Sequence, residues 1–166
     1  MTRIIAGEAR GRTIKVPAEG TRPTADRARE GLFSSLTARW GFAGSSVLDL
    51  FAGSGALGLE AASRGAEEAV LVESSADAVK IIRHNMGVVK HPGVRVQEMK
   101  VGTYLASAPR KHFDLVLADP PYAFDEVDAL IATIEPVLTD RAMVVIERHV
   151  DSADMVWPAG FEPTGQ

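Results

Sequence analysis

From about residue 46 onward, short apolar runs alternate along the chain with amphipathic stretches. Apolar runs of a few residues bounded by turn residues are typical of buried strands, and apolar residues three and four positions apart are typical of helices. The alternation predicts an α/β fold with a mostly parallel, doubly wound sheet and right-handed crossovers. The predicted strands are 46–51, 69–73, 94–98, 113–118 and 142–147, separated by helices at 55–64, 76–89 and 126–135 and a short turn or helix near 101–107.

The first 40 residues have a different pattern. Segments 3–5 and 13–16 flank the sequence from Gly7 to Gly11, which predicts a β-hairpin with a mobile, basic tip. A loop at residues 17–23 leads to a helix with Thr24 as its candidate N-cap, and several apolar residues of this helix fall on one face. We therefore divide the chain into an N-terminal extension, residues 1–40, and a main domain, residues 41–166.

The charge distribution supports the same division. The whole chain has a formal net charge of −4, but residues 1–40 contain eight Lys and Arg against four Asp and Glu, which leaves −8 for the remainder. A basic arm on an acidic body is typical of a protein that contacts a phosphate backbone. A solvated, charged surface is the alternative interpretation.

Composition excludes several classes of function. The chain has 166 residues and no cysteine, which excludes a disulfide framework, a cysteine-ligated zinc site and a catalytic thiol. The four histidines show no metal-ligand spacing, so we expect no metal cofactor. No apolar run approaches membrane-spanning length and no signal-peptide core is seen, so we expect a cytoplasmic protein that does not bind membranes.

A glycine-rich segment follows the first strand of the main domain. The spacing Gly53-x-Gly55-x-x-Gly58 matches the dinucleotide fingerprint, and Glu73, at the end of the next strand, could bind ribose hydroxyls. An NAD enzyme is therefore one alternative, and a tight connection without a ligand is another. Asp49, just before the loop, disfavours a pyrophosphate and suits a cationic ligand such as the sulfonium and amino group of S-adenosylmethionine.

A second candidate site is Asp119-Pro120-Pro121-Tyr122, directly after the predicted strand 113–118. Two prolines make the turn stiff and leave its carbonyls free to accept hydrogen bonds. These acceptors, with the carboxylate and an aromatic ring, suit a planar base that carries an exocyclic amine. Holding both amine hydrogens favours a pyramidal nitrogen that can attack an electrophilic methyl group. A plain strand-ending turn is the alternative.

Both motifs follow predicted parallel strands. Because ligands of such sheets bind beyond the carboxyl ends of the strands, we expect the glycine loop, Glu73 and the Asp-Pro-Pro-Tyr turn to open onto one pocket. Such a pocket would place a methyl donor beside a base.

The chain resembles the RsmD family of bacterial 16S rRNA methyltransferases, which act on N2 of guanine 966. The resemblance extends from Arg3 to about Phe161. It rests on the glycine loop, on the Asp-Pro-Pro-Tyr turn and on an N-terminal signature: Gly7-x-x-x-Gly11-Arg12, Pro17 and Arg22-Pro23-Thr24-x-Asp26-Arg27-x-Arg29-Glu30-x-Leu32-Phe33.

This resemblance implies a Rossmann-like class I methyltransferase fold with an N-terminal hairpin extension and S-adenosylmethionine as donor. It also implies 16S rRNA as substrate, within an assembled or late-assembly small subunit, and we expect a monomer. Family members have a seven-stranded sheet, whereas five strands are predicted before the sequence stops at Gln166. We therefore expect the C-terminal strand pair to be truncated.

Site residues follow from the same resemblance. For the donor, it implies contacts from Asp49, Phe51, Ala52, Gly53, Gly55, Glu73 and Val101. For the guanine, it implies that Asp119 and Pro120 hold the amine, with Pro121 in the turn and Tyr122 stacking on the base. For RNA, the candidate contacts are Arg10, Arg12, Arg22, Arg27 and Arg29.

One departure concerns the donor adenine. The acidic or amide residue that often binds the adenine amine is replaced by Lys100, which leaves backbone groups near Val101 or a displaced Glu98 for that role. Two further alternatives stay open: an amino-methyltransferase acting on adenine N6 or on another base in DNA or RNA, and a non-catalytic RNA-binding ribosome assembly factor.

Overall fold

The computed structural model describes residues 1–16, 23–121, 127–147 and 161, and for residues 23–28 and 127 only the backbone is described. Its main feature is a five-stranded sheet in the order β5-β4-β3-β6-β7, with every neighbouring pair parallel. The strands are β3 (Ser46–Leu50), β4 (Glu68–Glu73), β5 (Val94–Glu98), β6 (Phe113–Ala118) and β7 (Leu138–Ile146).

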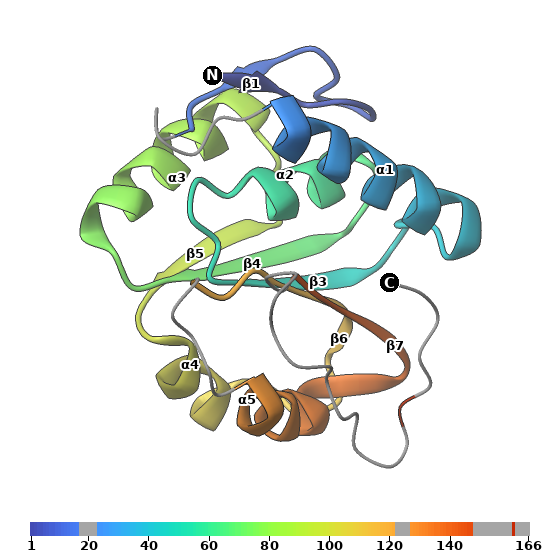
Figure 1. The fold of residues 1–166 in the computed structure, drawn as a ribbon, viewed down its shortest axis with the longest axis vertical. Helices are drawn as coiled ribbons and strands as arrows, with labels where there is room; N and C mark the ends of the chain where they lie inside the picture. The colour runs from blue at the N-terminus through green and yellow to red at the C-terminus, as the bar shows by residue number, and fades with distance from the viewer. Residues whose placement is uncertain (17–22, 122–126, 148–160, 162–166) are drawn as a thin grey trace.

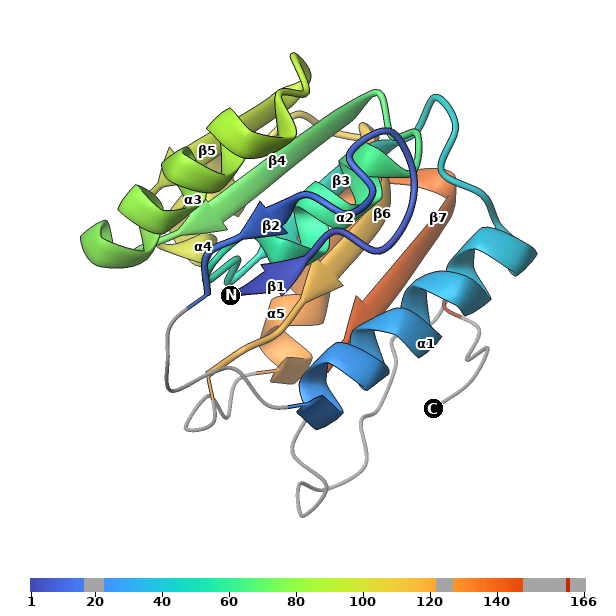
Figure 2. The same ribbon diagram turned by 90° about the horizontal axis from the view of Figure 1, so that it is seen from above.

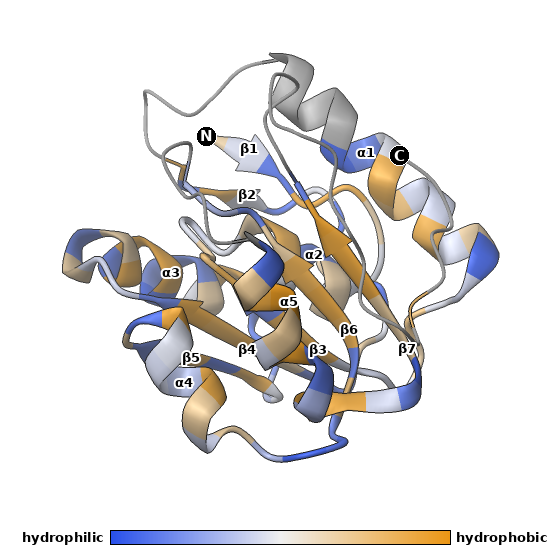
Figure 3. Ribbon diagram, turned by 60° about the horizontal axis from the view of Figure 1, so that its bottom comes forward, coloured by the Kyte–Doolittle hydropathy of each residue, from blue (hydrophilic) through white to orange (hydrophobic). Residues whose placement is uncertain are grey.

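Helices cover both faces of this sheet (Figure 1). On one face lie α1 (Pro23–Arg39), α2 (Ala56–Ser63) and α3 (Ala76–Val89), and on the other lie α4 (Val101–Ser107) and α5 (Val127–Ile134). Apolar residues dominate the strands, as Figure 3 shows, because both faces of the sheet are buried. The predicted α/β Rossmann-like fold is confirmed.

The predicted elements of the main domain match the structure closely except at the last strand. In the N-terminal extension, β1 (Thr2–Arg3) and β2 (Thr13–Ile14) are shorter than the predicted segments 3–5 and 13–16, and α1 begins at Pro23, so Thr24 is not its N-cap. Helix α3 and strands β5 and β6 have the predicted bounds, whereas β7 begins at Leu138, four residues before its predicted start. A short 3-10 helix (Glu135–Val137) precedes it, and the register shifts between Phe113 and Leu115 where β6 pairs with β7. The irregular first part of β7 contains polar residues, so a prediction based on apolar runs does not detect it. The predicted absence of a C-terminal strand pair concerns residues that lie largely outside the described part of the chain.

The predicted N-terminal hairpin is present, and its tip contacts α2 rather than extending into solvent. Strands β1 (Thr2–Arg3) and β2 (Thr13–Ile14) pair antiparallel and lie above α2, as seen in Figure 2. At the tip, the amide of Glu8 donates to the carbonyl of Ser63 at 2.9 Å, and the amide of Ala9 donates to Ser63 Oγ at 2.9 Å. The hairpin tip is therefore docked on the C-terminal end of α2.

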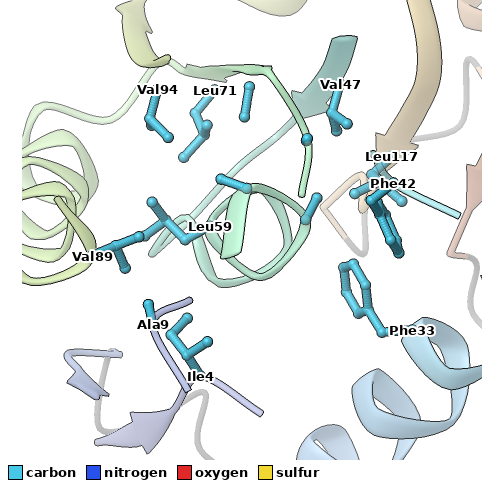
Figure 4. Packing of buried hydrophobic residues seen from close by; sticks show 14 of the residues in the cluster. Ile4, Ala9, Phe33, Phe42, Val47, Leu59, Leu71, Val89, Val94 and Leu117 are labelled. Atoms are coloured by element: carbon cyan, nitrogen blue, oxygen red, sulfur yellow. The ribbon is translucent and has the colours of Figure 1, made fainter. Parts of the chain in front are cut away.

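A buried glutamate completes this contact. Glu60 of α2 is fully buried and accepts hydrogen bonds from the amides of Ile5 at 2.8 Å and Ala6 at 3.1 Å. Its charge is balanced by Arg64, whose Nε lies 2.9 Å from Glu60 Oε2. Figure 4 shows apolar residues of the hairpin beside Leu59 of the same helix. The extension and the main domain therefore share one hydrophobic core.

Gly7→Ala is expected to destabilise the protein strongly. Gly7 has φ +88°, and a Cβ at this position would lie 1.8 Å from the backbone carbonyl oxygen of Ser63, which cannot move without disrupting α2. We expect a loss of about 3 kcal/mol or more in the free energy of unfolding, measured by urea denaturation.

Gly11→Ala is the matched control for this substitution. Gly11 has a similar φ of +84°, but a Cβ there would meet nothing within 4 Å. The substitution should therefore cost only the strain of placing alanine in the left-handed region, about 1–2 kcal/mol of the free energy of unfolding. Equal losses in the two variants would show that the hairpin tip is not held against α2.

Candidate active site

The two sequence motifs meet at one edge of the sheet. In the parallel register, Leu50 at the end of β3 pairs with Val72 of β4 on one side and with Ala118 of β6 on the other. The amide of Asp119 donates to the carbonyl of Leu50 at 3.4 Å, and the amide of Ala52 donates to the carbonyl of Val72 at 3.0 Å. The glycine loop therefore lies directly between the end of β4 and the Asp-Pro-Pro turn. One pocket shared by both motifs stays a prediction, because the cavity described below is lined by Phe51 and Glu73 but not by Gly53, Gly55 or Asp119.

The glycine loop has an unusual backbone. Gly53 and Gly55 have φ values of +60° and +83°, and a Cβ at Gly55 would lie 2.8 Å from Leu71 Cδ2. Phe51 has φ +58°, although it is not glycine. A bulky residue in this conformation costs roughly 1–3 kcal/mol and is found mainly where a site requires a particular backbone shape.

Asp49 lies beneath this loop. Its side chain is buried, and Oδ2 accepts from the amide of Gly58 at 2.9 Å, whereas Oδ1 has no hydrogen-bond partner among the described residues. Burial raises the pKa of Asp49 well above its usual range, and the nearby carboxylates of Asp119 and Glu73 raise it further. A cationic ligand at this edge would offset both effects.

Glu73 connects the loop to the next helix. Its Oε1 accepts from the amide of Gly53 and its Oε2 from the amide of Ser75, both at 2.8 Å. Ser75 in turn caps α3, because its hydroxyl accepts from the amide of Ala78. Both carboxylate oxygens are thus held by backbone groups, and each keeps acceptor capacity for ligand hydroxyls.

A cavity of about 630 Å³ opens beside Glu73, between the strand ends and the two helices α4 and α5. Its volume is within the range of cofactor sites. Three predicted donor-binding residues, Phe51, Glu73 and Val101, lie in its lining. The turn residues Asp119, Pro120 and Pro121 lie outside that lining, so the cavity suits the part of a ligand farther from the turn.

Sequence reasoning missed several residues of this cavity. Thr103 of α4 and Leu130 and Thr133 of α5 line it. Lys100, at the N-cap of α4, also lines it, and the sequence already places this residue near the donor adenine. Leu130 belongs to an apolar stripe that predicts only core packing. No local pattern marks such residues, because they reach the cavity through the packing of α5 beside α4.

Asp119 stands at the exposed rim of this edge, with Pro120 half-buried and Pro121 exposed. Although Asp119 keeps contact with solvent, partial burial raises its pKa to about 6, and the neighbouring Glu147 contributes to the rise. The amide of Glu147, just after β7, donates to the carbonyl of Ala118 at 2.9 Å. Glu147 was not predicted as a site residue, although it too follows a strand of the sheet.

The remaining turn residue, Tyr122, and two of the five candidate RNA contacts lie outside what the structure describes: Arg22 entirely, and Arg27 as a side chain. The roles proposed for them stay predictions. Arg10 is exposed at the hairpin tip, where it is accessible to a polyanion.

Arg29 is a correction to the predicted RNA contacts. Its guanidinium is buried, and Nη2 donates to Thr2 Oγ1 at 3.0 Å and to the carbonyl of Arg3 at 2.9 Å. Arg29 therefore holds β1 against α1 and does not present its charge to solvent. Arg12 is exposed, but its Nη1 donates to the carbonyls of Val88 and Val89 at the end of α3, so this contact also fixes the hairpin.

The electrostatics of the edge distinguish between possible ligands. Asp49, Glu73, Asp119 and Glu147 form a group of carboxylates: besides burial, the charges of Asp119 and Glu73 raise the pKa of Asp49, and that of Glu147 raises the pKa of Asp119. This field opposes an anionic pyrophosphate and favours a cation.

Within the described residues, no group of three or more His, Asp or Glu side chains is arranged to hold a metal ion. None of the described helices has the length and apolar character needed to cross a bilayer.

A doubly wound sheet with a glycine loop and an Asp-Pro-Pro turn at one acidic edge defines a Rossmann-like methyltransferase. The family model described as Conserved hypothetical protein 95 matches residues 2–166. The chain belongs to this family, the RsmD family of rRNA small-subunit methyltransferases.

Similar proteins agree with this assignment. Ribosomal RNA small subunit methyltransferase D of Escherichia coli K12 is 36% identical over 162 residues, which cover 96% of this chain and 80% of that protein. The protein of the same name from Haemophilus influenzae is 34% identical over 155 residues, covering 90% and 79%. The solved structure of yhhF from Escherichia coli has a TM-score of 0.82 and 36% identity, and the match covers 95% of this chain and 86% of that one.

Proposed function

We propose that the protein transfers a methyl group from S-adenosylmethionine to the exocyclic N2 of a guanine in small-subunit rRNA, at position 966. The observation that carries the proposal is the strand register that places Asp119 beside the glycine loop. The names of the relatives support rRNA as the substrate class. We further propose that the protein acts as a monomer on an assembled or late-assembly small subunit.

The residues present fit a sulfonium donor. Asp49 has an unpartnered, buried oxygen at the base of the loop, and Glu73 is held at the cavity, where it can accept from ribose hydroxyls. Val101 and the start of α4 line the adjacent part of the cavity, where we place the adenine. When bound, the donor supplies an electrophilic methyl group, and its C–S electron pair leaves with sulfur as the new C–N bond forms.

The protein contributes mainly orientation to this step. We assign Asp119 and the carbonyl of Pro120 to hold the two hydrogens of the guanine amine, so that its lone pair points at the methyl carbon. The new secondary ammonium then loses a proton to solvent or to Asp119. We assign stacking to Tyr122, which would offset about 1–3 kcal/mol of the cost of extruding the base.

Product analysis tests the proposed function directly. Small-subunit particles lacking the modification are incubated with isotope-labelled S-adenosylmethionine, and the digested rRNA is analysed by mass spectrometry. We expect labelled N2-methylguanosine at position 966. Labelled N6-methyladenosine would show an adenine-specific enzyme, and particle binding without any labelled product would favour a non-catalytic assembly factor.

The pKa of Asp119 predicts how activity depends on pH. Because it is raised to about 6, an increasing fraction of Asp119 is protonated as the pH falls below 6, and protonation removes the proposed acceptor. We expect kcat/KM, which reports the free enzyme, to be constant above about pH 7 and to fall towards tenfold per pH unit below 6. A profile that stays flat from pH 8 to pH 5 would contradict the role of Asp119.

Glu147→Gln is the matched variant for this profile. Removing the neighbouring negative charge lowers the pKa of Asp119, so the decline in kcat/KM should move to lower pH. The displacement should be smaller than the part of the shift due to burial, which is the larger cause. Both profiles are measured with the same unmodified particles.

A further inference from the structure

We propose that Asn85 is a positioning residue that couples the donor-binding loop to the N-terminal RNA-binding arm. By the arm we mean residues 1–16 only, which are the first part of the N-terminal extension: the hairpin and the two residues that follow β2. This inference rests on the proposed function, because it assumes a donor on the glycine loop and RNA on the arm.

Asn85 lies in the middle of α3 and is completely buried, although its side chain is polar. Its Oδ1 accepts from the amide of Lys15 at 2.7 Å, and its Nδ2 donates to the carbonyl of Lys15 at 2.8 Å. The same Nδ2 donates to the carbonyl of Ser54 at 2.9 Å. One side chain thus joins two segments that are 31 and 70 residues away in the sequence.

The chemistry of the site requires an amide. Lys15 offers one donor and one acceptor to Asn85, and Ser54 offers a second acceptor, so the partner must supply two N–H donors and one oxygen. A carboxylate would place an oxygen against two carbonyl oxygens. An apolar side chain would leave buried backbone groups unsatisfied, at about 1–3 kcal/mol each.

The position of Ser54 gives this contact its functional meaning. Ser54 lies between Gly53, whose amide is held by Glu73, and Gly55, the N-cap of α2. The loop is therefore fixed on one side by a cavity residue and on the other by Asn85. An adjustment of the loop on donor binding can therefore reach Lys15 through this buried amide.

Lys15 is the second-last residue of the arm and carries one of its positive charges. Its side chain is exposed, and its backbone amide and carbonyl are both held by Asn85. We infer that donor occupancy favours one placement of Lys15 and thereby raises affinity for RNA. By linkage, bound RNA must raise donor affinity by the same factor.

The experiment measures binding in both directions, independently of methyl transfer. Affinity for S-adenosylhomocysteine is measured with and without unmodified small-subunit particles, and affinity for the particles is measured with and without S-adenosylhomocysteine. In the natural protein we expect each ligand to strengthen the other on the order of tenfold. Asn85→Ala should bring this ratio close to one.

Two further variants keep the test interpretable. Asn85→Asp retains the acceptor for the Lys15 amide and has the same shape, so it serves if Asn85→Ala does not fold, and it should also lose the coupling. Ser63→Ala weakens docking of the hairpin tip on α2 but does not touch the glycine loop, so it should keep the coupling. KM for particles should rise in the Asn85 variants more than kcat falls.

Two results would overturn the proposal. One is a coupling ratio that survives in both Asn85 variants, and the other is an equal loss of coupling in Ser63→Ala. A natural protein that binds both ligands without coupling would also overturn it, while leaving the proposed function intact. Absence of donor binding altogether would instead contradict the proposed function.

Discussion

Asp119→Ala is expected to reduce methyl transfer by at least 100-fold while leaving donor affinity within a few-fold of the natural value. Asp119 stands at the rim of the strand edge, outside the lining of the 630 Å³ cavity, so its loss should not disturb most of the donor site. Loss of one oriented polar group at a reacting centre costs about 10²–10³ in kcat. The effect should appear in kcat, because the contact is needed most in the transition state.

Two variants at the same edge give this prediction its controls. Asp119→Asn keeps one oxygen acceptor and the shape of the side chain, so we expect an intermediate loss. Glu147→Gln removes a negative charge from the neighbourhood of Asp119 without removing the proposed acceptor, and should keep most activity at neutral pH. Single-turnover rates with labelled donor and calorimetric affinity for S-adenosylhomocysteine separate chemistry from binding. Natural turnover in Asp119→Ala would refute the assignment.

The second large effect is expected for Asp49→Asn, which should bind the donor about 10- to 100-fold more weakly. The range corresponds to a hydrogen bond between charged groups. In the natural protein, the amide of Gly58 donates to Asp49 Oδ2. In the variant, the side-chain oxygen of asparagine can accept the same hydrogen bond. The NH₂ group then replaces the unpartnered oxygen and repels a cationic amine.

Although Asp49→Asn should weaken donor binding, it should increase the stability of the folded protein. The pKa of Asp49 is raised in the folded protein, so at neutral pH its ionised form is less stable there than in the unfolded chain. Asp49→Asn removes this penalty and should raise the free energy of unfolding. The advantage over the natural protein should shrink as the pH falls through the raised pKa towards 3.8, because the natural side chain then becomes protonated.

Urea denaturation between pH 8 and pH 4, in the absence of ligand, checks this sign. Calorimetry with S-adenosylmethionine on the same samples checks the affinity. Weaker binding together with lower stability at neutral pH would mean that Asp49 has a structural role through Gly58 rather than a role in donor binding.

Sequence reasoning located the strand ends well, because buried parallel strands give continuous apolar runs and their carboxyl ends must share an edge. This placed Asp49, Glu73 and Asp119 together correctly. The tertiary contacts of the arm could not be found in the same way. Arg29 and exposed arginines are chemically identical in the sequence, and only the packing of β1 against α1 buries the former.

The same limit applies to the polar residues that organise the fold. Glu60 and Asn85 lie in helices where a polar residue is ordinarily assigned to the solvent-facing side. Each is buried because a backbone segment from the first 16 residues needs its hydrogen-bonding groups. No periodicity within α2 or α3 carries that information, since the partners lie 55 and 70 residues away.

The shared hydrophobic core limits how this enzyme can be re-engineered. Ile4 and Ile14 of the hairpin and Phe33 of α1 are almost inaccessible to solvent and belong to the same cluster as Leu71 and Leu117 of the sheet. If the first 16 residues were fused to another catalytic domain, Ile4 and Ile14 would lose their packing partners and be exposed to solvent. The main domain left behind would also expose the apolar residues that pack against them. Chimeras that test the proposed RNA-binding role of the hairpin should exchange its exposed side chains, and leave its backbone and inward-facing residues in place.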